Sequence, residues 1–201
     1  ILNINGKHSH RLAPLIDKLA LPTLVITDLD SAEPTGHHKK AEPMRKKGLI
    51  SGNYAITNWI IKKNLLDDLL DLSDDDKVVT KKSVCDYQIR VAYQIPIKVT
   101  HLDVEVEALA RTFEDSLIYT NWDVLSRLNT TDPGQLLKKL KDGFDAKKSF
   151  DSLKTTIFNE LKKSEVKAEF ALDLIFSIAP EEIAVPQYIN KGLTWLENIL
   201  C

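Results

Sequence analysis

The sequence has only two cysteines, Cys85 and Cys201, and no apolar run long enough to cross a bilayer. Two cysteines so far apart in the sequence predict neither a disulfide framework nor a zinc knuckle, and no signal peptide is visible, so we expect a reducing, cytoplasmic compartment. The chain also lacks an excess of one charge, with a formal net charge of -2. That balance gives no global attraction to nucleic acid, although local basic patches can still bind it.

The size and composition of the chain are those of an ordinary globular protein. Its 201 residues, 43% of them hydrophobic and 28% charged, allow one α/β domain with an insertion or two small units. The sequence begins at Ile1 rather than Met, within a predicted strand over 1–5. We therefore expect it to be a carboxy-terminal part of a longer protein, with at least one strand and one helix upstream.

The most informative segment is 24–31 (LVITDLDS), in which an apolar run ends in two aspartates, Asp28 and Asp30. The run is typical of a strand buried on both sides in a parallel sheet. On a strand, residues two apart share a face, and ligands bind open α/β sheets at the carboxyl ends of their strands. The pair therefore predicts a divalent-metal site. The alternative is that one aspartate caps the next helix or turn and the other is solvated.

The rest of the chain alternates apolar patterns with turn residues. A helix capped by Ser9 and ending near Ala20 lies between the strands 1–5 and 23–27, which predicts a β-α-β unit. The other expected elements are a polar loop at 31–50, a mostly helical stretch at 53–81 with a Ser73–Asp76 capping box, strands at 88–100 interrupted by Pro96, a helix or its approach at 105–119, amphipathic helices at 122–163, a helix at 165–178 capped by Ser164, and a terminal helix at 188–200.

Two further clusters could contribute chemistry. The segment 111–115 (RTFED) starts an amphipathic helix, and Lys167 lies near the amino end of another. Metal-dependent phosphodiester cleavage needs carboxylates to hold Mg²⁺ or Mn²⁺ and benefits from a cation beside the phosphate. Glu114 could add a ligand or orient water, and Lys167 could stabilise the transition state. Each residue taken alone is more often simply solvated.

Basic residues in the loop after Asp30 are candidates for contacts with DNA phosphates. Phosphate contacts there are a reasonable expectation, although a charged loop is often only solvated. Arg111 could hold a phosphate or pair with acids of the site. The pairs His8/His10 and His37/His38 lack the partners of a zinc site. The expected substrate-binding residues are Arg111, Lys39, Lys40, Arg45 and Lys46.

The order of these motifs resembles the carboxy-terminal Toprim nuclease region of the OLD (overcoming lysogenisation defect) family. The matching segments are 6–16 (GKHSHRLAPLI), 21–31 (LPTLVITDLDS), 111–116 (RTFEDS) and 167–171 (KAEFA). The resemblance implies that Asp28 and Asp30 are metal ligands, that Thr112 and Glu114 are the second-metal pair, and that Lys167 is catalytic. It implies a DNA endonuclease that uses Mg²⁺ or Mn²⁺, as in antiphage systems of the Gabija type.

The resemblance also implies the architecture. We expect a Toprim, Rossmann-like parallel sheet flanked by helices, with an α/β core over 1–121 that carries a helical insertion near 53–81, a helical subdomain over 122–163, and completing helices over 164–201. An amino-terminal ABC-type ATPase domain would be the only part that uses ATP. A homo-oligomer and a helicase-like partner stay open, and no membrane contact is expected.

One departure from the family pattern bears on the metal site. The Toprim pattern begins with a glutamate after its first strand, and no glutamate precedes Glu33 here. We expect that glutamate upstream, which would leave the metal site of these 201 residues incomplete and the isolated chain weakly active or inactive. Two alternatives remain: a degenerate Toprim-like module used for docking or dimerisation, and a haloacid-dehalogenase-like phosphatase. The phosphatase motif usually has Thr where this chain has Ala32.

Overall fold

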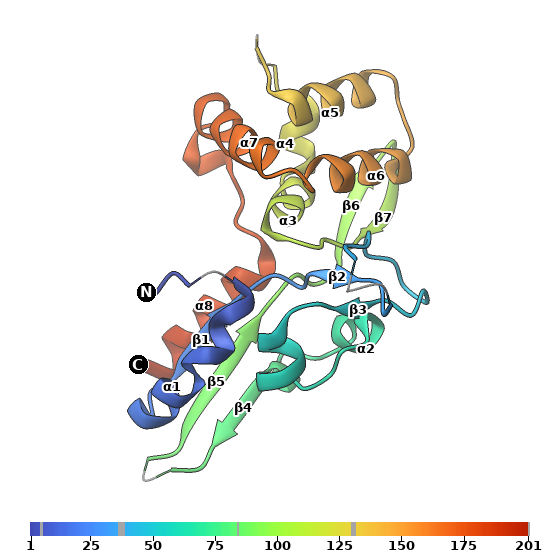
Figure 1. Ribbon diagram of the computed structural model, residues 1–201. Coiled ribbons are helices and arrows are strands. Elements are labelled where there is room, and N and C mark those ends of the chain that lie inside the picture. The colour runs from blue at the N-terminus through green and yellow to red at the C-terminus, as the bar shows by residue number, and fades with distance from the viewer. Residues whose placement is uncertain (5, 36–38, 84, 130–131, 201) are drawn as a thin grey trace. The chain divides into compact units, whose positions relative to one another are not determined.

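The computed structural model describes residues 1–4, 6–35, 39–83, 85–129 and 132–200 (Figure 1). Contacts within the chain divide it into two compact units. The first comprises Ile1–Ile95 and Gln187–Cys201, and the second Pro96–Pro186. This division does not identify a Toprim domain. The domain boundaries expected at residues 121 and 163 therefore stay a prediction.

The first unit is built on a three-stranded sheet in the order β1-β5-β4. The central strand, β5 (Tyr87–Ala92), is parallel to β1 (Thr23–Ile26) and antiparallel to β4 (Val78–Lys81). The structure therefore confirms a mixed α/β class. It does not confirm the expected Toprim sheet, because only one pair of the described strands in this sheet is parallel.

Helix α8 (Gln187–Leu200) packs on β1 and β5 and returns the end of the chain to the first unit. Gly192 makes this approach close, because a Cβ atom there would lie 3.0 Å from Leu24 Cδ1 and 3.1 Å from Ala92 Cβ. The other helical segments of the unit are η1 (Gly6–Leu12), α1 (Ala13–Leu19), the π-helix η2 (Ala55–Ile60), α2 (Leu66–Leu70) and the 3₁₀ turn η3 (Asp75–Lys77).

The second unit combines a hairpin with a group of helices. Strands β6 (Ile97–His101) and β7 (Val104–Ala108) are antiparallel, and the two turn residues between them have positive φ, as a tight hairpin turn requires. The helices are α3 (Phe113–Thr120), α4 (Trp122–Arg127), α5 (Gln135–Asp145), α6 (Phe150–Glu160), α7 (Ser164–Ser177) and the 3₁₀ turn η4 (Pro180–Glu182).

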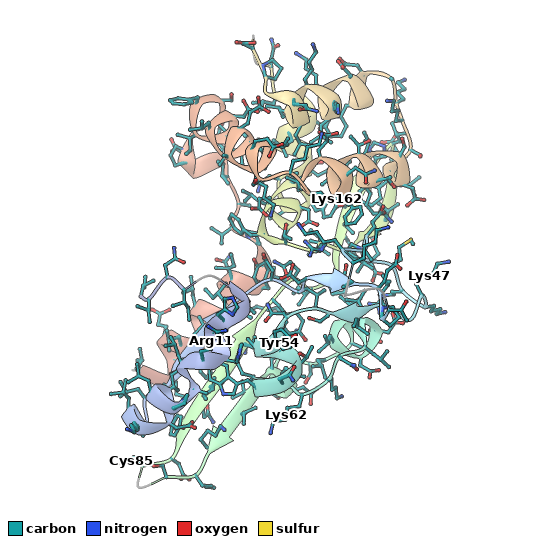
Figure 2. All side chains as sticks on the ribbon, in the orientation of Figure 1. Arg11, Lys47, Tyr54, Lys62, Cys85 and Lys162 are labelled. Carbon is teal, nitrogen blue, oxygen red and sulfur yellow. The ribbon has the colours of Figure 1, made fainter. Side chains whose placement is uncertain are left out.

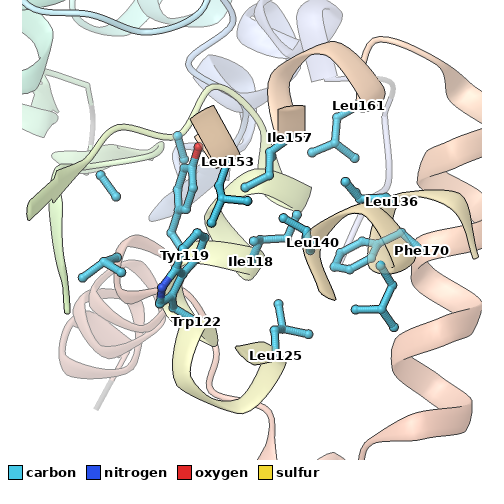
Figure 3. Close-up of a cluster of buried hydrophobic side chains, with 14 of the residues drawn as sticks. Ile118, Tyr119, Trp122, Leu125, Leu136, Leu140, Leu153, Ile157, Leu161 and Phe170 are labelled. Atoms are coloured by element: carbon cyan, nitrogen blue, oxygen red, sulfur yellow. The ribbon is translucent and has the colours of Figure 1, made fainter. Parts of the chain in front are cut away.

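The core of the second unit is formed by apolar residues of these helices (Figure 3). Trp122 meets Phe144 and Phe150 edge to face, with ring centroids 5.0 and 5.2 Å away. Leu140 of α5 and Ile157 of α6 are fully buried beside them. This core confirms the prediction of amphipathic helices over 122–163, because their apolar faces are the surfaces that pack.

Several other sequence predictions are confirmed. The terminal helix is present as α8, and the strand after Pro22 is present as β1. Pro96 lies between β5 and β6, as its missing N–H group predicts. Ser73 and Asp76 form the predicted reciprocal contact, since the Asp76 N–H donates to Ser73 Oγ and the Ser73 N–H donates to Asp76 Oδ2. This contact lies at the start of the short η3 turn, whose N-cap is Asp74.

Several local predictions are wrong, among them the cap of the helix at 165–178, since Ser164 is the first residue of α7 and the N-cap is Lys163. Residues 1–4 form no strand, and Ser9 lies inside η1 instead of capping a helix. The stretches 53–81 and 105–119 are not helical throughout. The first ends in strand β4 (78–81), and the second begins in strand β7 (104–108). Both strands carry a signal that favours them: β4 is rich in β-branched residues, and β7 alternates apolar and acidic side chains.

Candidate functional site

The two aspartates lie just beyond the end of β1. The Thr27 N–H still donates to the Ala92 carbonyl at 3.0 Å, but the strand itself ends at Ile26. Asp30 has a left-handed backbone with φ of 53°, and Leu29 between the two acids is fully buried. Asp28 and Asp30 therefore lie beyond the strand, and the prediction that they share one face of a strand is wrong. The acids belong to a loop at the carboxyl end of a strand, which is where the sequence places a ligand site.

Gln94, which follows β5, holds this loop from one side. Its Nε2 donates to Asp28 Oδ1 at 2.9 Å, and its Oε1 accepts from the Leu29 N–H at 2.6 Å. The same Nε2 lies 3.2 Å from the Tyr188 hydroxyl of α8. Gln94 is 1% exposed, so a fully buried amide fixes both the Asp28 carboxylate and the backbone beside it.

Residues at the end of β3 and just after it hold the Asp28–Asp30 loop from the other side. The loop over 31–50 is closed at its ends by the antiparallel pair β2 (Ser31–Ala32) and β3 (Ile50–Ser51). Asn53 Nδ2 donates to Thr27 Oγ1 at 2.7 Å and to the Asp28 carbonyl at 2.6 Å. Ser51 Oγ donates to the Leu29 carbonyl at 2.6 Å, and the Gly52 N–H donates to the Asp30 carbonyl at 2.9 Å. Hydrogen bonds thus fix the backbone of the Asp28–Asp30 loop before any ligand binds.

The donor chemistry of this loop suits a hard cation only in part. Mg²⁺ prefers oxygen ligands and is commonly bound by one or two carboxylates together with waters and substrate phosphates. Asp28 and Asp30 supply two carboxylates on a fixed backbone. Among the residues that the structure describes, no group of three or more His, Cys, Asp and Glu side chains is placed to hold a metal ion. The residues fit a metal that takes further ligands from water and substrate.

A second polar cluster lies at the start of α3, in the other unit. The Asp115 carboxylate accepts from the Arg111 N–H at 2.7 Å and from the Thr112 N–H at 2.6 Å. Thr112 is the N-cap of α3, so this is a capping box with Asp at the third helical position. Sequence reasoning missed Asp115 as a structural residue, although the Thr-x-x-Asp spacing is a signal for it.

Glu114 and Lys167 meet in this second cluster. Lys167 Nζ of α7 lies 2.7 Å from Glu114 Oε2, and Thr112 Oγ1 donates to the same oxygen at 2.7 Å. The two side chains are 24% and 28% exposed. Burial alone would raise the pKa of Glu114, but the hydrogen bonds from Lys167 and Thr112 and the charge of Lys167 outweigh it and lower that pKa. Glu114 is therefore an ionised carboxylate with a fixed cationic partner.

The predicted site residues thus fall into two groups. The structure brings Thr112, Glu114 and Lys167 together in the second unit, where their contact joins α3 to α7. Asp28 and Asp30 belong to the first unit. The roles of all five in metal binding or catalysis remain predictions.

Some of the expected phosphate-binding residues contact acidic side chains, and others have exposed side chains. Arg45 Nη1 pairs with Asp71 at 2.8 Å, and the Lys46 N–H donates to the Asp67 carboxylate at 3.0 Å. Figure 2 shows Lys47 at the outer end of the loop between β2 and β3. The side chains of Lys39, Lys40 and Lys46 are exposed, whereas Arg111 is buried; His37, His38 and Cys201 lie outside the described residues.

No helix in the described part of the chain combines the length and the apolar character needed to span a membrane. No family model matches the chain, and no solved structure matches it. The chain is 27% identical over 206 residues to endonuclease GajA of Bacillus cereus (strain HuB5-5), in an alignment that covers all of the chain. The chain spans 27% of the length of that relative. This similarity relates the chain to an endonuclease.

Proposed function

We propose that the chain is the Toprim nuclease region of an OLD-family protein and cleaves DNA phosphodiesters with Mg²⁺ or Mn²⁺. The observation that carries the proposal is the Asp28–Asp30 pair, held on a hydrogen-bonded loop at the carboxyl end of β1, in a chain related along its whole length to an endonuclease. Action in antiphage defence, beside an ABC-type ATPase domain, follows from the same family assignment.

In this proposal Asp28 and Asp30 hold the metal, which supplies Lewis-acid stabilisation of the phosphate and an activated water. Gln94 keeps the Asp28 carboxylate in place and Asn53 keeps its backbone in place. Because hydrogen bonds fix the loop before binding, the loop loses little conformational freedom when the ion binds. The two carboxylates are then held in a defined geometry.

Glu114 and Lys167 form the second part of the proposed machinery. Because Glu114 stays ionised beside Lys167, the pair can present either a carboxylate to a second metal or an ammonium to the phosphate. Thr112 orients Glu114 through its hydroxyl. The family roles of Thr112, Glu114 and Lys167 are therefore compatible with the contacts that these residues make.

The role of Lys167 can be tested by separating rate from affinity. In a Lys167→Met variant, the rate of plasmid nicking at saturating DNA should fall far more than DNA affinity, because a transition-state contact affects the rate constant. Lys162→Met is the matched control, since Lys162 is exposed (Figure 2) and its Nζ lies over the Phe158 ring of the helix just before it. Weaker DNA binding with an unchanged rate at saturation would make Lys167 a binding residue only.

A second candidate function is a Toprim-like module that docks or dimerises without catalysis. It is favoured by the absence, among the described residues, of three or more metal-binding side chains at one place. A full-length protein that folds but shows no nicking with either Mg²⁺ or Mn²⁺ at any DNA concentration would support this candidate over the nuclease.

A further inference from the structure

A group of three basic side chains surrounds one carboxylate in the first unit, away from the residues assigned above. Asp74 Oδ1 lies 2.8 Å from Arg90 Nη2 of β5, and Asp74 Oδ2 lies 2.9 Å from Lys191 Nζ of α8. Lys77 completes the group, 5.1 Å above the Tyr93 ring. We call Lys77, Arg90 and Lys191 the basic cluster.

Two of the three members of the basic cluster are buried. Lys77 is 4% exposed and Arg90 is 6% exposed. Burial lowers the pKa of Lys77, and the neighbouring charges of Lys191 and Arg90 lower it further against the attraction of Asp74. Asp76, the other acid near Lys77, is exposed and bound by Ser73. Buried cations are costly unless they are paired, so this group favours an additional anion.

Arg90 supplies a second and independent observation. Its Nε is buried and has no hydrogen-bond partner among the described residues, although a buried donor normally has one. The guanidinium therefore uses Nη2 for Asp74 and leaves a donor unused. Arginine can present two parallel donors to a carboxylate or a phosphate, and here only one side of that geometry is occupied.

The space between these side chains has a volume of about 10 Å³, enough for about one water molecule. It is lined by the cluster and Asp74, by Tyr93 and Tyr188, and by the apolar residues Val91, Ala92 and Ile95. A larger anion would have to take the place of the Asp74 carboxylate. The Asp74 and Lys191 side chains are 41% and 40% exposed, so both lie at the solvent side of the group. The Asp74 carboxylate can therefore leave while Arg90 and Lys77 stay fixed.

We propose that the basic cluster is a binding site for a phosphate group, and that the Asp74 carboxylate occupies the phosphate position when no ligand is bound. Phosphate offers more acceptor oxygens than a carboxylate and can reach Arg90 Nε as well as Nη2. The site is linked to the Asp28 loop, because Tyr188, one turn before Lys191 on α8, contacts Gln94. A phosphate of the DNA backbone is the expected ligand, a point that rests on the proposed function, whereas the site itself does not.

Inorganic phosphate is the probe for this site. Binding is measured by calorimetry and by the thermal midpoint, with EDTA present and NaCl used to keep the ionic strength constant. Lys191→Met should weaken phosphate binding about tenfold, the value of one charge-assisted hydrogen bond. Asp74→Asn should strengthen it by a similar factor, because it removes the competing charge. Lys82→Met, which breaks only an exposed pair with Asp86, should change nothing.

The proposal predicts that phosphate affinity falls in Lys191→Met and rises in Asp74→Asn. These opposite changes distinguish a ligand site from a structural ion pair. If the cluster were only structural, Asp74→Asn would lower stability and no variant would bind phosphate above the NaCl control. That result would overturn the proposal. If Asp74→Asn does not fold, the comparison of Lys191→Met with Lys82→Met decides the question, and equal phosphate affinities would overturn it.

The source of the phosphate is decided by competition. A short DNA duplex that displaces phosphate from the wild-type protein, and does so less well from Lys191→Met, identifies the DNA backbone as the ligand. Phosphate binding that DNA does not disturb identifies a site for free phosphate. Because EDTA is present throughout, failure of the metal assignment at Asp28 and Asp30 would not affect either result.

Discussion

Replacement of Gln94 by leucine tests whether the Asp28 loop is held by its buried amide. Leucine has a similar volume but can neither donate nor accept. The variant leaves the N–H of Leu29 without its acceptor in a fully buried position and removes the donor to Asp28 Oδ1. It also removes the contact with the Tyr188 hydroxyl.

The size of the effect follows from these contacts. An unsatisfied buried N–H costs about 1–3 kcal/mol, and the lost bond to a charged but partly exposed carboxylate adds roughly 1 kcal/mol. The free energy of unfolding should therefore fall by about 2–4 kcal/mol. If Asp28 binds a metal, the loss of its supporting residue should also weaken Mn²⁺ binding by about 10- to 100-fold.

A Gln94→Glu variant separates the two effects. It keeps an acceptor for the Leu29 N–H and so should lose less stability, but it brings a second carboxylate to Asp28 in place of a donor. The assays are urea unfolding and Mn²⁺ titration. Gln88→Leu, on the preceding strand β5, is the control, because the side chain of Gln88 makes only a long contact with Thr80. The reasoning is refuted if Gln94→Leu matches that control in both assays.

Three further predictions concern the second unit. Leu140→Ala should lower the free energy of unfolding by about 2–5 kcal/mol, because Leu140 is fully buried in the core; a change below 1 kcal/mol in urea unfolding would contradict that. Asp115→Ala removes the acceptor of two N–H groups at the start of α3 and should cost about 1–2 kcal/mol, measured in the same way. The lowered pKa of Glu114 means that its ionised form contributes stability above its ordinary pKa of 4.5, and that this contribution is lost as the pH falls through the lower folded value. The stability advantage of the wild type over Glu114→Gln should therefore shrink on acidification, and an advantage that grows would show that the sign is wrong.

The helices could be predicted because their signals are local and repeated. In α5 the buried residues Leu136, Leu137 and Leu140 recur at helical spacing, and the polar residues between them face outward. Strands β4 and β7 have only four and five residues, and a neighbouring helical signal outweighed their short patterns. Short strands depend on pairing with distant residues, which no local pattern contains.

Only part of the candidate site could be predicted from the sequence. Asp28 and Asp30 stand out because two acids follow an apolar run. Gln94 and Asn53 do not, since a single uncharged amide far along the chain has no local signal that it binds this loop. The contact between Glu114 and Lys167 spans 53 positions, and no local pattern predicts that these two side chains touch.

The most direct test of the account is nicking of supercoiled plasmid by an Asp28→Asn variant of the full-length protein in Mg²⁺ and in Mn²⁺. Asparagine keeps an oxygen for Gln94 Nε2 but loses the charge that would hold the ion. Asp68→Asn, on the exposed surface of α2, is the control. The account predicts that Asp28→Asn stays folded and nicks no faster than the wild type in EDTA, while the control keeps full activity. Full metal-dependent nicking by a folded Asp28→Asn protein would contradict it.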